Sequence, residues 1–346
     1  MTVRSMLITW KTNLLIDPLT IMKEFILCNQ RVYTVAIMAF MAIQIGCTDK
    51  KTNSMVSETY STSEKIHFYI DPDKISDDLP EKLTYGLFIT APWEKGGELY
   101  MNFPEHLSYN PVGNTIQRHY DAIPIPWIIS PDGKQASYRV ESLALTDVYV
   151  ESSARVMNDG EFPFEAQGVH VSMRIINHGS KTLPVIRPLI CNQFADLTGF
   201  PQHHHDFNNN HIVMNGHITS LSDLPTENLE TTFKGCVVEG CPQRDTNARK
   251  KGGLIEQDMD AALSIVTSLD QQRKVIFWWN PGKSMIANSY IPCIHADPYF
   301  GTLKPGEEGY AEGLILFTDG NIKPIVKYLK NRSTAGGQSQ WNKKKN

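Results

Sequence analysis

The sequence predicts an all-β protein, a large antiparallel β-sandwich with one short helix near its C-terminus. Two observations favour this fold class. Short segments rich in β-branched and aromatic residues alternate apolar and polar side chains with period two. Turn residues, not helical stretches, separate these segments, which is typical of a sandwich or barrel. A hydrophobic fraction of 41% and a charged fraction of 20% are those of a globular protein with a full core.

The N-terminus resembles a bacterial lipoprotein signal. Lys23 and Arg31 precede an apolar run over 32–46, which is shorter than the about 20 residues of a membrane span and ends at Ile-Gly-Cys. The resemblance implies that Cys47 is lipidated and becomes the first residue of the mature chain. An N-terminal membrane anchor that is never cleaved remains the alternative.

This signal divides the chain into four expected parts. Residues 1–47 are the leader, of which 1–21 precede a better initiator at Met22. Residues 48–64 are rich in Ser and Thr and form a flexible tether. A single β-sandwich domain covers 65–331, and a basic, disordered tail covers 332–346. We therefore expect a lipoprotein of the bacterial cell envelope, in the periplasm or on the outer membrane.

The strands of the domain follow from alternation and turn signals. They are expected at 66–70, 83–90, 137–142, 147–158, 169–175, 183–190, 212–221, 262–268, 274–279 and 313–319. The segment 183–190 is expected to return as the partner of 169–175 after a turn. Proline and asparagine interrupt 93–127, which predicts a long irregular excursion there. The segment 321–331 predicts the helix, with Asn321 as its cap.

Two segments resemble the galactose-mutarotase-like supersandwich proteins. They are GVHVSMRIINHGSKTLPVIRPLICNQF (168–194) and IPCIHADPYFGTLKPGEEGYAEGLILF (291–317). The resemblance implies a strand and turn that lead to a sugar site, and a closing strand that carries a catalytic carboxylate. This sequence has Asn192 where an epimerase offers histidine, and the segment 293–297 where it offers glutamate. The resemblance therefore implies a carbohydrate-handling scaffold, also used by polysaccharide lyases and glycosidases, without selecting one activity.

The catalytic prediction rests on two strands of that scaffold. Arg187 interrupts an apolar strand, and its planar guanidinium suits a uronate carboxylate or a sulfate. We expect Arg187 and Asn192 to face His295 and Asp297, which are candidates for an acid–base pair. An internal ion pair for Arg187, and ordinary turn contacts for His295 and Asp297, remain the structural alternatives.

The polar stretch 187–217 also holds five of the eleven histidines. His205, His211 or Tyr120 is a candidate base for removing a carbon-bound proton. If the chain binds a metal, His203, His205 and His211 are the expected ligands, although the sequence requires no cofactor. A polar loop without chemistry is the alternative.

Aromatic residues supply the candidate sugar-binding surfaces. Trp93, Trp127 and Trp279 are expected to stack on substrate, with packing in the core as the alternative for each. Trp278 and Trp279 are expected on opposite faces of one strand, so at least one belongs to the core.

Four cysteines lie outside the leader. Cys236 and Cys241 are close enough in sequence for a loop disulfide, whereas Cys191 and Cys293 are either bridged or buried free thiols. The sequence leaves their connectivity open.

These observations favour a lipid-anchored protein that acts on an anionic polysaccharide or oligosaccharide, as a lyase of uronates or as a hydrolase or sugar epimerase. A glycan-binding lipoprotein without catalysis is the second hypothesis, and a metal-site protein built on the histidine cluster is the third. A net charge of −4 gives no indication of a basic surface that would bind nucleic acid. The expected partners are a carbohydrate and, through the lipid, a membrane.

Overall fold

The computed structural model describes residues 65–71, 86–108, 116–118, 127–140, 148–183, 186–202, 206–228, 231–241 and 253–333. All of them belong to one unit, Thr59–Asn346. The predicted leader with Cys47, the tether and nearly all of the tail lie outside the described residues. Within the described part of the chain, no helix is both long and apolar enough to cross a membrane.

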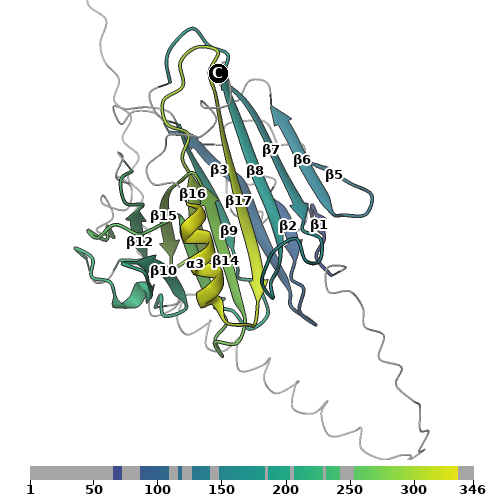
Figure 1. Ribbon diagram of the computed structural model, residues 1–346, viewed down its shortest axis with the longest axis vertical. Helices are drawn as coiled ribbons and strands as arrows, with labels where there is room; N and C mark the ends of the chain where they lie inside the picture. Colours follow the sequence, from purple (N-terminus) through teal and green to yellow (C-terminus); the bar gives the residue numbers. More distant parts are fainter. Residues whose placement is uncertain are drawn as a thin grey trace, which may run out of the picture. The chain divides into compact units, whose positions relative to one another are not determined.

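Two antiparallel sheets of eight and nine strands form the described fold (Figure 1), which confirms the predicted β-sandwich. The strands are β1 (Phe68–Tyr69), β2 (Leu87–Thr90), β3 (Glu98–Ser108), β4 (Ile116–Arg118), β5 (Ile128–Ile129), β6 (Gln135–Val140), β7 (Val148–Val156), β8 (Gln167–Asn177), β9 (Arg187–Gln193), β10 (Asn210–Met214), β11 (His217–Ser220), β12 (Phe233–Val237), β13 (Leu263–Thr267), β14 (Lys274–Asn280), β15 (Gly282–Asn288), β16 (Cys293–Pro298) and β17 (Glu308–Thr318). The eight-stranded sheet has the order β1-β2-β3-β9-β16-β15-β12, with β4 paired to β3. The nine-stranded sheet has the order β11-β10-β13-β14-β17-β8-β7-β6-β5.

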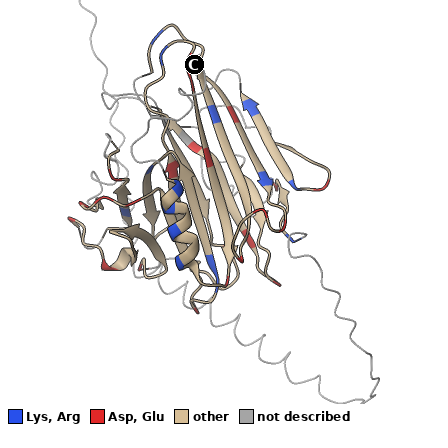
Figure 2. Ribbon diagram, in the orientation of Figure 1, with Lys and Arg blue, Asp and Glu red and all other residues tan. Residues whose placement is uncertain are grey.

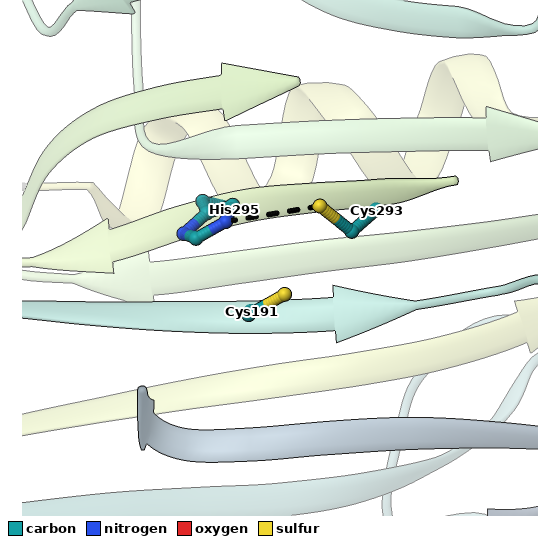
Figure 3. Close-up of side chains that lie close together, drawn as sticks. All are labelled: Cys191, Cys293 and His295. Atoms are coloured by element: carbon teal, nitrogen blue, oxygen red, sulfur yellow. Dashed lines mark hydrogen bonds between the residues drawn. The ribbon is translucent and has the colours of Figure 1, made fainter. Parts of the chain in front are cut away.

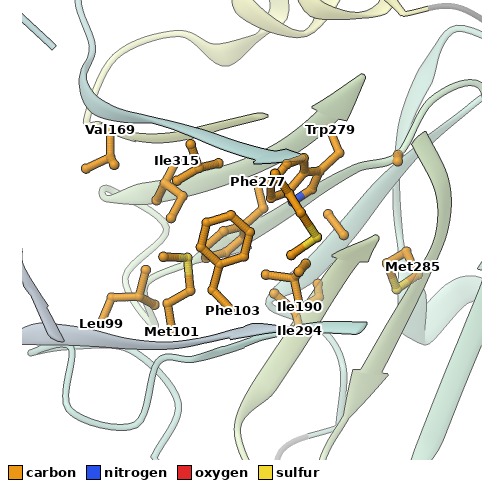
Figure 4. Close-up of a cluster of buried hydrophobic side chains, with 14 of the residues drawn as sticks. Leu99, Met101, Phe103, Val169, Ile190, Phe277, Trp279, Met285, Ile294 and Ile315 are labelled. Atoms are coloured by element: carbon orange, nitrogen blue, oxygen red, sulfur yellow. The ribbon is translucent and has the colours of Figure 1, made fainter. Parts of the chain in front are cut away.

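The main core lies between the two sheets (Figure 4). Leu99, Met101 and Phe103 alternate along β3 and are buried against side chains of the other sheet, such as Phe277 and Ile315. Because successive strand residues point to opposite faces, the residues between these positions lie on the face of β3 away from the core. The same rule applies to β9 and β16, and it places the candidate site described below.

The helix α3 (Ile322–Arg332) covers part of the outer face of the nine-stranded sheet, as predicted for 321–331. Asn321 caps it, because its side-chain oxygen accepts the backbone N–H of Lys323 at 3.0 Å. Ile325, Val326 and Leu329 are buried against that sheet in a second apolar cluster. Basic side chains lie along the helix, and both signs of charge are scattered over the strands (Figure 2).

The stretch 93–127 is not irregular throughout, contrary to the prediction. It contains β3, which runs next to β9 in the eight-stranded sheet. The pairing register of β3 with β9 shifts between Asn102 and His106, and Pro104 lies inside that shift. A proline is tolerated at a bulge because no ladder hydrogen bond is required of it there, so the proline signal concealed a strand.

The expected pairing of 169–175 with 183–190 is also wrong. The first segment forms β8, which pairs with β7 and β17 in the nine-stranded sheet. The second leads into β9, which pairs with β3 and β16 in the other sheet. The turn between them therefore carries the chain from one sheet to the other.

The predicted strand 212–221 is a hairpin of β10 and β11. Asn215 and Gly216 form its two-residue turn, with φ angles of 49° and 78°. A two-residue hairpin turn of this kind requires positive φ at both positions, and Asn-Gly is one of the residue pairs that adopt it most readily. The Asn-Gly pair is therefore a turn signal in the sequence, although the residues on both sides of it resemble one continuous strand.

An ion pair at the end of β7 predicts a small dependence of stability on pH. Arg155 Nη1 donates to Glu161 Oε2 at 2.9 Å, and this pairing lowers the Glu161 pKa from 4.5 to about 2. The stabilisation is therefore complete above pH 4.5 and is lost as the pH falls towards 2. Replacing Glu161→Gln should lower the free energy of unfolding by about 0.2–1 kcal/mol at pH 7, since the pair is exposed.

Urea unfolding of both proteins at several pH values checks this expectation. The difference between them should shrink between pH 4.5 and 2. Glu227→Gln, at an exposed position, is the control and should change the free energy of unfolding at pH 7 by no more than about 0.5 kcal/mol. A difference that is constant with pH would mean that the ion pair does not stabilise the fold.

Candidate functional site

Three side chains from neighbouring strands meet on the face of the eight-stranded sheet that points away from the core (Figure 3). Cys191 on β9 is the pairing partner of His295 on β16, and Cys293 lies two residues before His295 on the same face. Their candidate ligand atoms all lie within 4.8 Å of one another. The Cys293 sulfur is 4.0 Å from Nε2 of His295. The register of two strands thus brings together two thiols and an imidazole.

Two carboxylates approach the imidazole from opposite sides. Glu105 Oε2 lies 3.7 Å from Nε2 of His295, and Asp297 Oδ1 lies 3.8 Å from Nδ1. Asp297 is fully buried, and each of its carboxylate oxygens accepts a hydrogen bond. The backbone N–H of Ile190 donates to its Oδ1 at 3.0 Å, and the Ser284 hydroxyl donates to its Oδ2 at 3.1 Å. The aspartate position is therefore fixed by the sheet itself.

The electrostatics of the cluster follow from burial and proximity. Burial by itself lowers the pKa of His295, but Cys293 and the charges of Glu105 and Asp297 outweigh it and raise the pKa to about 10. The hydrogen bond with Cys293, together with burial, raises the pKa of the Cys191 thiol. Without a bound cation, the imidazole is thus held in its charged form at neutral pH.

Some polar atoms of this face have no hydrogen-bond partner among the described residues. They include Oδ1 of Asn102 and Nδ1 of His295, both buried. Asn102 is the pairing partner of Cys191 on β3, so it lies in the same row across the sheet as Cys191 and His295. A buried polar atom without a partner is costly. The cluster therefore has hydrogen-bonding capacity to offer a ligand.

Access to the cluster is greatest at Glu105. Its side chain is 23% exposed, against 9% for His295 and 0% for Asp297. Cys191 and Cys293 are 2% and 5% exposed. Of these five residues, Glu105 is therefore the group best placed to meet a molecule that arrives from solvent.

A row of aromatic rings on the same face leads towards the cluster. Tyr69, Phe88 and Tyr100 are successive cross-strand partners, with ring centroids 5.0 and 4.7 Å apart. Tyr100 is in turn the partner of Gln193, and Gln193 is the partner of Cys293. Tyr69 and Tyr100 are partly exposed. The face therefore combines a ring surface with a group of acids and thiols.

The structure brings β9 next to β16, as the predicted site requires, but it separates Asn192 from His295. Asn192 points into the core, where its amide donates to the carbonyl of Ile294 at 3.2 Å. The expectation that Asn192 faces His295 is wrong by one residue, because Cys191 occupies that face. Arg187 begins β9 opposite Ser108, and its side chain is outside the described part of the structure.

Of the remaining catalytic and metal candidates, only His211 lies within the described residues. His211 lies on β10 in the other sheet, where burial lowers its pKa and Nδ1 has no partner among the described residues. His203, His205 and Tyr120 lie outside the described residues. Their predicted roles remain predictions.

The three candidate tryptophans take part in packing. Trp127 and Trp279 are 7% and 3% exposed and belong to the core between the sheets. Trp93 is partly exposed, but Phe200 stacks on it at 5.9 Å and Phe317 meets it edge-on at 5.6 Å. As predicted, Trp278 lies on the opposite face from Trp279, towards α3. The exposed aromatic surface of the site consists of tyrosine instead.

Cys191, Cys293 and Glu105 are the residues that the sequence did not assign to the site, although burial without a disulfide was one of the two alternatives for Cys191 and Cys293. None of the described cysteines, Cys191, Cys236, Cys241 and Cys293, forms a disulfide, so the loop disulfide considered for Cys236 and Cys241 is not present. One signal was available: Cys293, His295 and Asp297 occur at alternate positions, as one face of a strand requires. The prolines that flank this segment favoured a turn instead. Nothing in the sequence near Glu105 pointed to its role.

No protein-family model matches the sequence, and no curated protein matches it significantly. Solved structures with a similar arrangement include a polysaccharide lyase, at 10% identity and a TM-score of 0.31 over 75% of this chain. The chain spans only 33% of that lyase. Others are an aldose 1-epimerase homologue from Escherichia coli K12 (10% identity, TM-score 0.33, 64% of this chain and 84% of that one) and a GalM/aldose epimerase homologue from C. elegans (10% identity, TM-score 0.35, 74% and 88%). Structural neighbours thus include galactose-mutarotase-like proteins at low identity.

Proposed function

We propose that this chain is a carbohydrate-active protein that binds sugar over the outer face of the eight-stranded sheet. The observation that carries the proposal is the register that connects the aromatic row of Tyr69, Phe88 and Tyr100 to the cluster around His295. Aromatic rings offer an apolar surface with a polar handle, and the apolar face of a sugar ring fits such a surface. The acids and amide next to them supply hydrogen bonds to hydroxyl groups.

Within this site we assign proton transfer to Glu105. It is the most exposed acid of the cluster, and the imidazolium of His295 at 3.7 Å favours its charged form. A carboxylate of this kind can remove the proton next to the carboxylate of a uronate. The electron pair then forms a carbon–carbon double bond as the glycosidic oxygen leaves, which is the lyase reaction. An anionic polysaccharide is therefore the substrate class to test first, and the predicted lipid anchor would hold the protein in the cell envelope.

A substitution in the aromatic row tests the binding part of the proposal. Tyr100→Ala removes a partly exposed ring. We expect the variant to bind a glycan about tenfold more weakly than the unchanged protein, which corresponds to about 1.4 kcal/mol. A panel of glycans is first screened with the unchanged protein. Titration calorimetry with the glycans that bind then measures the effect. Tyr149→Ala is the matched control, because Tyr149 is a partly exposed tyrosine on the other sheet.

The catalytic part is tested by incubating the purified chain with uronate polysaccharides. Ultraviolet absorbance should rise as unsaturated ends form, and Glu105→Gln should abolish the rise. Binding without any rise would favour a glycan-binding protein without catalysis. If no glycan of the panel binds, or if Tyr100→Ala and Tyr149→Ala behave alike, the proposed site is wrong.

A further inference from the structure

We propose that Cys191, Cys293 and His295 bind a zinc ion on the outer face of the eight-stranded sheet. The three are candidate ligand groups within 4.8 Å of one another, all of them buried. Two thiolates and one imidazole form a soft ligand set that suits zinc. The site is distinct from the predicted histidine cluster, and it does not depend on the proposed carbohydrate function.

The distance between Cys293 and His295 fits a tetrahedral ion after a small adjustment, and the Cys191 sulfur lies within 4.8 Å of both ligand atoms. With metal–sulfur and metal–nitrogen bonds of about 2.3 and 2.0 Å, a tetrahedral angle separates sulfur from nitrogen by about 3.5 Å. The Cys293 sulfur and Nε2 of His295 are 4.0 Å apart (Figure 3). A movement of about half an ångström, shared between two side chains, therefore brings these ligands to coordination distance.

Asp297 provides the second observation. It faces Nδ1 of His295, the nitrogen on the side away from Cys293, at 3.8 Å. Histidines that bind metals usually direct their other ring nitrogen to a carboxylate or carbonyl, which fixes the tautomer and the orientation of the ring. Asp297 is fully buried and held by Ile190 and Ser284. The arrangement gives Nδ1, which now has no hydrogen-bond partner among the described residues, a defined role as donor to Asp297.

A disulfide is a poorer explanation for the two cysteines. Cys191 is paired with His295, and Cys293 is paired with Gln193, so the cysteines are diagonal neighbours on antiparallel strands. Diagonal neighbours are about 7–8 Å apart, whereas a disulfide requires Cα atoms about 4.4–6.8 Å apart. A metal ion bridges two sulfurs without moving the strands.

Of the cluster's acids, Glu105 is the best placed to meet a fourth ligand of the ion. Its carboxylate is 3.7 Å from Nε2 of His295 and is the most exposed acid of the cluster. Zinc sites with three protein ligands keep a fourth position for water or substrate. A zinc ion bound in this cluster would replace the imidazolium charge beside Glu105 and would still favour the charged carboxylate that the assigned proton transfer requires.

Metal analysis of the full chain tests the proposal. The protein is prepared with a removable tag free of histidine, treated with chelator, supplied with zinc and dialysed. We expect about one zinc ion per chain, and loss of that zinc in Cys293→Ser and in Cys191→Ser. Cys236→Ser is the matched control, because Cys236 is a buried cysteine that forms no disulfide and lies outside the cluster, and it should retain the metal.

Two further readouts distinguish ligation from a general effect on folding. Cobalt in place of zinc should give the intense ultraviolet absorption of thiolate–cobalt bonds, which Cys293→Ser loses and Cys236→Ser keeps. Asp297→Asn should keep the ion but weaken its binding by about 10–100-fold. Far-ultraviolet circular dichroism confirms that each variant has folded before its metal content is compared.

Several results would overturn the proposal. The first is that the unchanged protein holds no more zinc than Cys293→Ser, and the second is that Cys293→Ser retains zinc. The third is a Cys191–Cys293 disulfide found by thiol alkylation and mass spectrometry. Tight binding of another metal but not of zinc would also overturn it. If the protein binds no zinc, the glycan titration still tests the proposed function. The two proposals can therefore fail separately.

Discussion

Replacing Trp279 by alanine is expected to lower the free energy of unfolding by about 3–5 kcal/mol. The ring is 3% exposed and lies between the sheets, with its centroid 5.4 Å from that of Phe103. It also fills the space over Gly313, where a Cβ atom would come within 2.8 Å of the indole. Truncation at this position leaves a cavity that the two sheets cannot close without moving.

Urea unfolding followed by circular dichroism measures the effect, as a lower midpoint at an unchanged slope. Trp279→Phe keeps most of the ring and should cost less than the alanine variant. Trp93→Ala is the second control, because Trp93 is partly exposed and packs at the edge of the core. A loss below about 1 kcal/mol for Trp279→Ala would contradict its place in the core and would revive the prediction that it stacks on a sugar.

The fold class was predictable because alternation is a local property of the sequence. The segment 169–175 shows this clearly, because strand alternation puts Val169, Val171 and Met173 on one face, and all three are buried in β8. The helix cap at Asn321 was equally local. Each of these features depends on residues only a few positions apart.

The pairing of strands was not predictable in the same way. The partners of β9 are β3 and β16, which are distant in sequence, and their register is decided by how the whole core packs. The cluster of Cys191, Cys293 and His295 exists only because of that register. The sequence identified His295 and Asp297 but could not reveal that Cys191 lies opposite the histidine.

Asp297→Ala is expected to be the most damaging change within the site, with a loss of about 3–5 kcal/mol in the free energy of unfolding. Its carboxylate is fully buried and accepts hydrogen bonds from the backbone N–H of Ile190 and the hydroxyl of Ser284. It also lies 3.8 Å from Nδ1 of His295, whose positive charge it helps to hold. Alanine would leave two donors without an acceptor and a buried charge less compensated.

Comparison with Asp297→Asn separates the hydrogen bonds from the charge. Asparagine retains one oxygen as an acceptor for Ile190, so its loss should be smaller than that of alanine. Urea unfolding in the presence of chelator measures both variants without any contribution from a bound metal. Asp319→Ala, at an exposed position at the end of β17, should stay within about 0.5 kcal/mol of the unchanged protein. If Asp297→Ala behaves like Asp319→Ala, then the carboxylate does not anchor β16 to β9 and β15, and the geometry of the whole cluster would have to be revised.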